Sequence, residues 1–390
     1  MVSIGIIGAP NKGKSTLFSS LTLNEVAIAN YPFTTIKPNK GIAYLSKRCV
    51  ESDFNTRCNA RDNLCIDGTR LIPINIIDTA GLVKGAHQGR GMGNQFLNDI
   101  SGAEGFIIVA DLSGKTDQNG NPCDSCNPVD DVEFIIEEIV KWLSSILKRN
   151  MPSISRIEDG PSALQQILSS FKLRKEQIEE AIEQNSLSSR YIRWSNDEIE
   201  QFSRYVISRY KSFIVAANKD DLNYNKEYLK ELESRYPTVH CSADIELALR
   251  RADQKGIISY RPWESRFRIL KETDSIALKD ALSRIEDYLV RNNGTHVQEL
   301  INRLVFDIMK YIVVYPVENE NSLSDSNGNI LLDAILLKEG STAEDLAYII
   351  HSDLAKNMLY AIDARSKMRI PKEYILKDND IIKIVSKRSY

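Results

Sequence analysis

Gly8-Ala9-Pro10-Asn11-Lys12-Gly13-Lys14-Ser15 stands between an apolar run at residues 2–7 and Thr16-Leu17-Phe18. We therefore expect a strand, a glycine-rich loop and a helix start, the context in which G-x-x-x-x-G-K-[ST] binds phosphate. Glycines let successive N–H groups turn toward an anion, and the helix N-terminus adds the positive end of its dipole. The Lys14 ammonium would contact the β- and γ-phosphates, and the Ser15 hydroxyl would bind Mg²⁺. The sequence thus predicts a nucleoside triphosphate site that includes Asn11, Lys12, Gly13, Lys14, Ser15 and Thr16.

A second polar motif, Asn218-Lys219-Asp220-Asp221, follows the apolar strand expected at 213–217. The Asp221 carboxylate can accept hydrogen bonds from N1–H and the 2-amino group of guanine, whereas adenine would leave it unpaired. Lys219 would lie along the base, and Asn218 would tie this loop to the phosphate loop. An acidic loop between a strand and a helix is the alternative interpretation. Backbone N–H groups would meet the guanine oxygen at the next strand end, at Ser242, Ala243 and Asp244.

A third motif, Asp78-Thr79-Ala80-Gly81, ends the apolar strand expected at 71–77. In a D-x-x-G segment of this kind, Asp78 would hold Mg²⁺ through water, and the Gly81 N–H would sense the γ-phosphate. The polar, proline-containing loop at 30–35 would complete the metal shell through Thr35 in preference to Thr34. Both segments would be released when the γ-phosphate is lost, which predicts two switches. Lys14, Thr35 and Gly81 are therefore the predicted hydrolytic residues, and Ser15, Thr35 and Asp78 the predicted metal ligands.

Leu82 follows Gly81 where a water-positioning glutamine often stands, so slow intrinsic hydrolysis is expected. His87, Gln88 or Arg90 in the glycine-rich stretch 85–96 would supply the missing group, with an ordinary surface loop as the alternative. The Asn11 amide oxygen is a candidate ligand for K⁺, which would neutralise charge on the transferring phosphoryl group.

Together these motifs resemble the Obg-related GTPases of the YchF/Ola branch. The resemblance rests on Gly8–Phe18, Tyr31–Asn39, Ala80–Ala86 and Gly91–Leu97, and it extends over nearly the whole chain. It implies a G domain with a helical insert and a C-terminal TGS domain. It also implies that the leucine after glycine, here Leu82 after Gly81, is a family trait, and that the protein associates with translation and ribosomes. Many members of the branch have a degenerate base-recognition motif and prefer ATP. Since the motif at 218–221 is intact here, GTP is expected.

The predicted fold is α/β: a P-loop GTPase domain with a mostly parallel sheet, a coiled-coil-like helical insert and a β-grasp TGS domain. Apolar residues recur at three and four from Val132 to Leu147, and about a hundred residues separate the strands at 105–111 and 213–217, far more than one crossover helix needs. We expect an antiparallel helical pair there. The domain limits are 1–130 with 211–305 for the G domain, 131–210 for the insert and 306–390 for the TGS domain.

The net charge of −3 gives no overall attraction to nucleic acid, so RNA contacts would need local basic clusters. Two candidates are Lys172, Arg174 and Lys175 in the insert, and Arg365, Lys367, Arg369 and Lys372 in one C-terminal loop; ordinary solvated surface is the alternative for both. No apolar run approaches the ~20 residues that cross a bilayer, and the first residues do not resemble a signal peptide, which predicts a cytoplasmic protein without membrane contact.

The six cysteines favour reduced thiols over a disulfide framework. A four-cysteine zinc site that joins Cys123 and Cys126 to Cys49, Cys58 and Cys65 is the alternative, although the upstream spacing is loose.

The predicted function is a translation-associated regulatory switch that binds GTP and GDP and hydrolyses GTP slowly with Mg²⁺. Its partner would be a ribosome or structured RNA, contacted through the helical insert and the TGS domain. The alternative is an ATP-hydrolysing or nucleotide-gated docking scaffold whose turnover is incidental.

Overall fold

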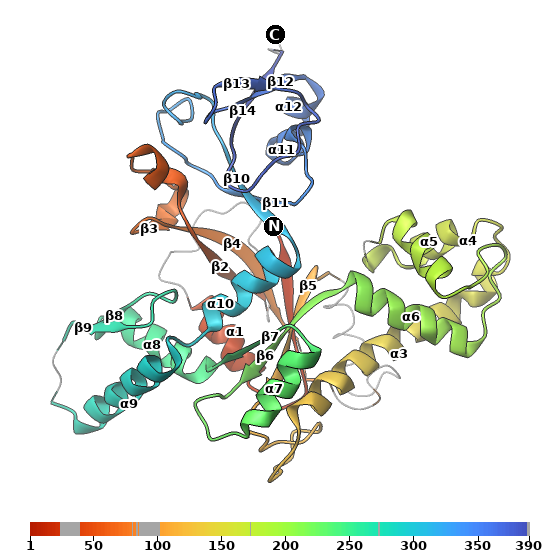
Figure 1. Cartoon of the computed structure of the whole chain (residues 1–390), viewed down its shortest axis with the longest axis horizontal. Coiled ribbons are helices and arrows are strands. Elements are labelled where there is room, and N and C mark those ends of the chain that lie inside the picture. The colour runs from red at the N-terminus through yellow and green to blue at the C-terminus, as the bar shows by residue number, and fades with distance from the viewer. Residues whose placement is uncertain are drawn as a thin grey trace.

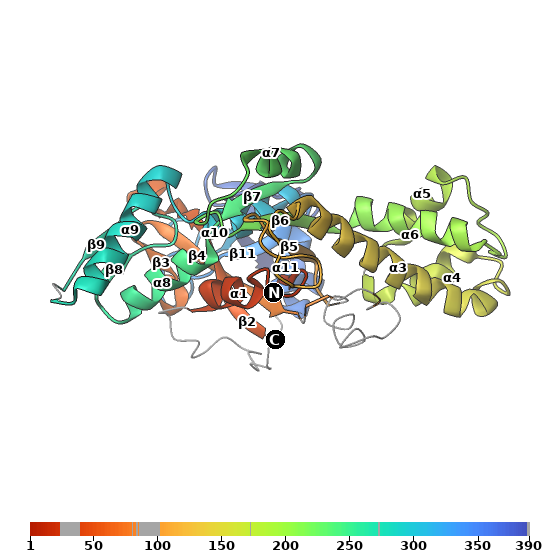
Figure 2. The same ribbon diagram turned by 90° about the horizontal axis from the view of Figure 1, so that it is seen from below.

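The structure is a computed structural model of the chain, and it describes residues 1–23, 40–79, 81–82, 85, 102–171, 173–271 and 274–387. A sheet lies at the centre, and three parts project from it: a helical arm, a smaller lobe and a C-terminal domain (Figure 1). The arm and the lobe extend from opposite ends of the long axis (Figure 2).

The central sheet has the strand order β2-β4-β1-β5-β6-β7, with β3 paired to β4. All neighbours are parallel except the pairs that β2 and β3 make with β4. The strands are β1 (Ser3–Ile7), β2 (Lys40–Arg48), β3 (Cys65–Ile66), β4 (Thr69–Asp78), β5 (Gly105–Asp111), β6 (Ser212–Asn218) and β7 (Thr238–Cys241). The expected G-domain fold, with its mostly parallel sheet, is thereby confirmed.

Both faces of this sheet are buried, because its parallel strands are apolar throughout. In β5 the side chains of Phe106 and Ile108 join one core, and those of Ile107 and Val109 join the other. Helices α3 (Pro128–Ile154) and α7 (Lys226–Arg235) cover the first face, and α1 (Lys14–Thr22) and α10 (Val297–Asn302) cover the second. The strand ends that carry the polar motifs therefore meet at one edge of a fully covered sheet.

The helical arm begins and ends at the sheet. Helix α3 leads outward after β5, and α6 (Asn196–Tyr210) packs along it and returns to β6. Between them lie α4 (Gly160–Ile167), the 3₁₀ turn η4 (Ser169–Phe171) and α5 (Lys175–Gln184). The segment at 161–186 is thus divided into three short helical pieces. Its buried residues share one core with the first sheet face, so the arm continues the G-domain core.

The lobe on the other side was not distinguished from the sequence. It consists of α8 (Ala243–Gln254), the hairpin β8 (Ile258–Tyr260) with β9 (Phe267–Ile269), and α9 (Ile276–Asn292). Its small core is separate and centres on Tyr260, Leu282 and Leu289. The lobe lies directly after the Ser242 segment and so borders the candidate site.

The C-terminal domain is a five-stranded mixed sheet of order β11-β10-β14-β12-β13 with two helices on it. Its elements are β10 (Tyr311–Pro316), β11 (Ile335–Lys338), α11 (Ala343–Ile350), α12 (Ser352–Lys356), β12 (Met358–Asp363), β13 (Met368–Ile370) and β14 (Ile381–Ser386). A π-helical turn, η5 (Arg303–Ile308), connects it to α10. The β-grasp arrangement expected for a TGS domain is confirmed. Helix α11 is capped by Thr342, whose hydroxyl accepts a hydrogen bond from the Asp345 N–H.

Strand β11 begins only at Ile335, because the Ile330 carbonyl accepts a hydrogen bond from the Asn59 N–H of the G domain at 2.8 Å. The basic residues expected in one loop are divided: Arg365 and Lys367 lie in the turn after β12, Arg369 lies in strand β13, and Lys372 lies in the turn after it. Among them Arg365 forms an ion pair with Asp53 at 2.9 Å, so it is committed to an internal contact.

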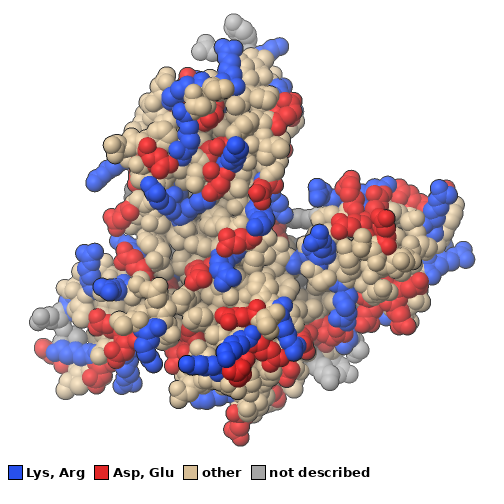
Figure 3. Space-filling model, viewed as in Figure 1, with Lys and Arg blue, Asp and Glu red and all other residues tan. Residues whose placement is uncertain are grey.

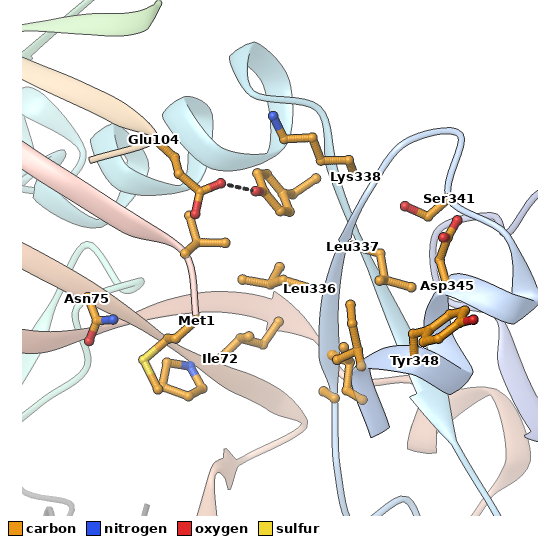
Figure 4. A pocket seen from close by; sticks show the side chains of 16 residues that line it. Met1, Ile72, Asn75, Glu104, Leu336, Leu337, Lys338, Ser341, Asp345 and Tyr348 are labelled. Atoms are coloured by element: carbon orange, nitrogen blue, oxygen red, sulfur yellow. Dashed lines mark hydrogen bonds between the residues drawn. The ribbon is translucent and has the colours of Figure 1, made fainter. Parts of the chain in front are cut away.

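A cavity of about 1060 Å³ lies where this domain meets the sheet. The Tyr311 hydroxyl donates to Glu104 across its wall at 2.7 Å (Figure 4). Apolar side chains of Ile72, Leu336 and Leu337 line it, together with Met1 and Tyr348. The cavity borders Met1 and Val2 at the start of β1, whereas the phosphate loop follows the other end of that strand.

Five of the six cysteines fall into two groups, and the sixth, Cys241, is free and buried at the end of β7. Cys123 and Cys126 form a disulfide with each other, which contradicts the expectation of reduced thiols for this pair. Cys49, Cys58 and Cys65 are free and gather elsewhere, between β2 and β4. The alternative of a zinc site that joins both groups is therefore wrong, since Cys123 and Cys126 are bonded to each other on a hairpin after β5. Within the described ranges, no helix is both long and apolar enough to cross a bilayer.

Candidate functional site

The phosphate loop connects β1 to α1 as its sequence predicts. Gly13 caps the helix with φ +95°, a conformation that favours glycine, and a Cβ there would lie 2.3 Å from the Asn218 amide nitrogen. The Lys14 ammonium is buried and donates to the Ala9 carbonyl at 2.7 Å, within the loop itself. Lys14 therefore lies in the concave side of the loop, where an anion would be held.

The structure brings Ser15 and Asp78 together. The Ser15 hydroxyl donates to Asp78 Oδ2 at 3.0 Å. The other carboxylate oxygen, Oδ1, is buried and has no hydrogen-bond partner among the described residues. Burial raises the pKa of Asp78, and the Ser15 bond and the Lys14 charge oppose that shift. A buried carboxylate oxygen left over beside a hydroxyl fits Mg²⁺, which prefers oxygen ligands. The third predicted ligand, Thr35, lies outside the described residues.

Gly81 and Leu82 lie beside the phosphate loop, the first near the Lys14 ammonium and the second with its side chain in the core. A Cβ on Gly81 would lie 3.3 Å from the Lys14 ammonium, so this backbone faces the phosphate end of the site. Leu82 donates its N–H to the Gly8 carbonyl at 3.1 Å, and its side chain is buried in the core with Phe106. The Leu82 side chain is thus directed away from the place where water would attack.

One more backbone contact links this segment to the arm. The Gly85 N–H donates to Glu138 Oε1 at 3.2 Å, and Glu138 is a buried residue of α3. The residues expected to help hydrolysis, His87, Gln88 and Arg90, lie outside the described residues.

Asn218 holds three loops together. Its amide nitrogen donates to the Lys12 carbonyl at 3.0 Å, and its amide oxygen accepts from the Ala243 N–H at 3.1 Å. The hydrogen bond expected between Asn218 and the phosphate loop is therefore present. The same side chain fixes the segment Ser242, Ala243 and Asp244 next to it.

Lys219 extends back over the phosphate loop. Its ammonium donates to the Asn11 carbonyl at 2.9 Å and forms an ion pair with Asp111 at 2.8 Å. Burial raises the pKa of Asp111, but hydrogen bonds from Lys219, Ser113 and Thr116 outweigh it, so the pKa is lowered. The stem of Lys219 thus spans the space between the phosphate loop and the residues after it.

The two adjacent carboxylates have different surroundings. Asp220 is buried, and it bonds His240 Nδ1 at 2.8 Å and the Tyr288 hydroxyl at 2.5 Å. Asp221 is exposed and accepts from the Ser242 hydroxyl at 2.6 Å. Asp220 therefore joins the loop to the lobe, while Asp221 faces outward and is held in place by Ser242.

Sequence reasoning missed the partners of the residues inside the phosphate loop. Lys12 is fully buried and forms an ion pair with Asp131 at 2.8 Å, so its ammonium is turned away from the loop's concave side. It also donates to the Thr116 carbonyl, and the Asn11 amide donates to the Gly120 carbonyl at 2.9 Å. These bonds attach the hairpin at 116–122 to the loop. Asp111 ends β5 as Asp78 ends β4, and its carboxylate accepts from the Thr116 hydroxyl at 2.6 Å. This polar residue at a strand end was the signal in the sequence that the hairpin at 116–122 borders the site.

We expect the stability of the nucleotide-free protein to rise at alkaline pH because of Lys14. Burial lowers the pKa of Lys14 from 10.5 to about 8, and Asp78 opposes the shift. Between about pH 8 and 10.5 the unfolded chain binds more protons at this residue, so the free energy of unfolding increases with pH there, by about 3 kcal/mol in all. Denaturant unfolding from about pH 7.5 to 10 should show this gain in the wild type relative to Lys14→Met. A difference that stays constant with pH would contradict it.

Three family descriptions match the chain. Residues 3–152 match "50S ribosome-binding GTPase", residues 216–319 match "Obg-like GTPase YGR210-like, G4 motif-containing domain", and residues 327–386 match "TGS domain". The first match ends within α3, the second runs from β6 through the lobe to the residues after β10, and the third covers β11 to β14.

Relatives match over nearly the full length. An uncharacterized GTP-binding protein from Methanocaldococcus jannaschii is 46% identical over 99% of both chains. The crystal structure of a GTP binding protein from Pyrococcus horikoshii is 34% identical, with a TM-score of 0.79 over 99% of this chain and 100% of that one. The ribosome-binding ATPase YchF of Buchnera aphidicola is 25% identical over 97% of both. The chain therefore belongs to the Obg-like, YchF-type family of P-loop GTPases with a G domain and a TGS domain.

Proposed function

We propose that the chain is a GTP-binding switch that hydrolyses GTP slowly and acts in translation. The observation that carries the proposal is the position of Asp221, whose exposed carboxylate is held by Ser242 beside the loop that Asn218 bonds to the phosphate loop. A carboxylate there accepts from the N1–H and 2-amino groups of guanine. Adenine has neither donor, and it would leave the carboxylate desolvated without a partner.

The remaining site residues take the roles that their positions support. Asn11 to Thr16 hold the phosphates, and the backbone at Ser242, Ala243 and Asp244 meets the guanine oxygen. Ser15 and Asp78, with Thr35, hold Mg²⁺; the unpartnered Asp78 oxygen supports this assignment. Lys14, Thr35 and Gly81 contact the γ-phosphate, and the 2.7 Å bond of Lys14 to Ala9 keeps its charge within the loop. Mg²⁺ supplies positive charge to the phosphate oxygens when it is bound.

Slow hydrolysis follows from the place of Leu82. Its aliphatic side chain is buried in the core, so it cannot orient the attacking water. We infer that K⁺ at the exposed Asn11 amide oxygen neutralises part of the phosphoryl charge. This inference is compatible with the structure, since Asn11 is exposed and its amide nitrogen donates to the Gly120 carbonyl.

The partner we propose is a ribosome or structured RNA in the cytoplasm, because relatives are named ribosome-binding. The contacts would come from the insert at 131–210 and the TGS domain at 306–390, with the G domain at 1–130 and 211–305 between them. Positive and negative side chains alternate over the face shown in Figure 3, so local groups rather than a broad field would meet phosphate. In the insert Lys175 is paired with Asp159 at 2.8 Å, and Lys172 lies outside the described residues. In the TGS domain Arg369 lies over the Tyr360 ring at 4.6 Å and is exposed.

The second candidate function is an ATP-dependent docking scaffold. It is favoured by the names of relatives, which include an Obg-like ATPase homolog from Saccharomyces cerevisiae at 26% identity. In that case the outward carboxylate of Asp221 would have no role in base choice.

Competition titration with fluorescent nucleotides tests the choice. ATP lacks the hydrogen bonds that guanine donates to Asp221. The loss of even one of them should make GTP bind at least tenfold more tightly than ATP, a difference of about 1.4 kcal/mol. Equal affinities for the two nucleotides would contradict GTP recognition and favour the scaffold.

A further inference from the structure

Three cysteine thiols and one carboxylate converge between β2 and β4, outside the nucleotide site. They are Cys49, Cys58, Cys65 and Glu51, and one ligand atom from each lies within 4.8 Å of all the others. Cys49 is fully buried and the other three are half-buried. Cys49 lies between β2 and the 3₁₀ turn η1 (Val50–Phe54), Glu51 lies in η1, Cys58 in the loop after it and Cys65 in strand β3, so the fold assembles the four from separate positions.

The separations match the edges of a tetrahedral zinc site. Cys49 Sγ and Cys58 Sγ are 3.9 Å apart, and Cys65 Sγ lies 3.7 Å from Glu51 Oε1. With Zn–S bonds of about 2.3 Å, two ligand sulfurs at the tetrahedral angle lie about 3.8 Å apart, and a sulfur and an oxygen lie about 3.5 Å apart. A disulfide would need about 2.05 Å between the sulfurs, and three thiols cannot all pair.

The carboxylate is already oriented for one metal bond. Glu51 Oε2 accepts from the Cys58 N–H at 2.7 Å, which leaves Oε1 directed toward the sulfurs. A hydrogen bond that fixes one oxygen of a ligand carboxylate is the usual supporting contact around a metal site. The Cys49 N–H is likewise engaged, by the Gly68 carbonyl at 2.7 Å.

A buried cation lies next to the cluster. Arg70 of β4 is 2% exposed, and its Nε has no hydrogen-bond partner among the described residues. Cys49, Cys58 and Tyr315 all act on this guanidinium electrostatically. Three thiolates and a carboxylate around a divalent ion leave the site anionic, so it would supply the counter-charge that a buried guanidinium needs.

We propose that Cys49, Cys58, Cys65 and Glu51 form a closed, structural Zn²⁺ site. Thiolate sulfur selects a soft or borderline ion, and four protein ligands without an open position indicate a structural rather than a catalytic role. The segment at 49–68 has only 3₁₀ turns and a two-residue strand, so the metal would supply much of the free energy that folds it.

The site also affects the contacts that this segment makes with the TGS domain. The same residues 49–68 contact the TGS domain through Asp53 with Arg365, Asn59 with Ile330, and Arg61 with Asp333 at 2.8 Å. Arg70 donates to the Leu331 carbonyl at 2.5 Å from beside the cluster. Zinc binding would therefore fix the surface on which the C-terminal domain rests, near the end of β2 and β4 drawn in orange (Figure 1).

Metal analysis of the full chain, purified under reducing conditions and reconstituted with Zn²⁺, tests the site. We expect about one tightly held zinc per chain, and Co²⁺ in its place should give the intense visible and sulfur-to-metal bands of a tetrahedral thiolate site. Cys58→Ser and Cys65→Ser should each weaken Zn²⁺ binding at least tenfold. The matched control, Cys123→Ser with Cys126→Ser, should keep it.

Because the serine variants at 58 and 65 can fail to fold, thiol alkylation of the wild type provides a second measurement. Zn²⁺ should protect Cys58 and Cys65 from alkylation, and Cys123 and Cys126, once reduced, should stay reactive. Failure of Zn²⁺ and Co²⁺ to bind, or loss of the metal in the Cys123/Cys126 control, would overturn the proposal.

Discussion

Asp221→Asn is expected to weaken GTP binding at least 100-fold and to make xanthosine triphosphate the preferred ligand. Guanine offers two donors to the carboxylate, and charge-assisted hydrogen bonds contribute about 1.5–3 kcal/mol each, so the loss of one and weakening of the other corresponds to about 2.7 kcal/mol or more. Xanthine has a carbonyl oxygen where guanine has its amino group, and the asparagine amide can donate to it. Titration of the wild type and of Asp221→Asn with GTP and with xanthosine triphosphate measures this change in preference.

The neighbouring carboxylate is the matched control for this experiment. Asp220 is buried against His240 and Tyr288, so Asp220→Asn should lower stability while leaving the ratio of GTP to xanthosine triphosphate affinity unchanged. Asp221 is exposed, and its replacement should leave the unfolding midpoint close to that of the wild type. A GTP affinity that does not change in Asp221→Asn would refute the assignment of the base site.

Asp78→Asn should slow GTP hydrolysis at least 100-fold and raise the Mg²⁺ concentration that gives half-maximal rate by tenfold or more. The aspartate is the one negatively charged ligand among the predicted set, and its Oδ1 is buried without a partner among the residues that the structure describes. An amide would therefore replace a strong ligand by a weak one. Ser15→Ala should have the same effect in smaller degree, because it removes a neutral oxygen and leaves the carboxylate.

Hydrolysis measured against Mg²⁺ concentration distinguishes these variants from a general loss of folding. Asp124→Asn, at an exposed carboxylate on the hairpin after β5, should behave as the wild type. An Asp78→Asn enzyme with the same Mg²⁺ dependence as the wild type would exclude Asp78 from the metal shell.

The fold and the order of the motifs were predictable because they depend on local patterns. Buried parallel strands are apolar throughout, and Asp78, Asn218 and Ser242 each follow one, so their convergence at a single sheet edge follows from topology alone. The Asn218 bond to the phosphate loop was expected for the same reason. These predictions needed only residues close to strand ends.

What the sequence did not reveal depends on contacts between distant residues. The Lys12–Asp131 pair joins positions more than a hundred residues apart, and nothing in either local sequence marks the other as its partner. Cys49, Cys58 and Cys65 have irregular spacing, so pairing them with Cys123 and Cys126 was as reasonable as grouping them with Glu51. Strand β13 was missed because Met368-Arg369-Ile370 is short and lies among charged residues.

The 27-residue helix α3 links the Gly85 segment to the outer part of the arm, because its Glu138 side chain accepts the Gly85 N–H. Glu138 lies 16 residues before the outer end of the helix at Ile154, a span of about 24 Å at 1.5 Å per residue. A tilt of about 10° at Glu138 would displace the outer end by about 4 Å. Any tilt of the helix at this contact would therefore produce its largest displacement at the periphery, where a bulky partner can sense it.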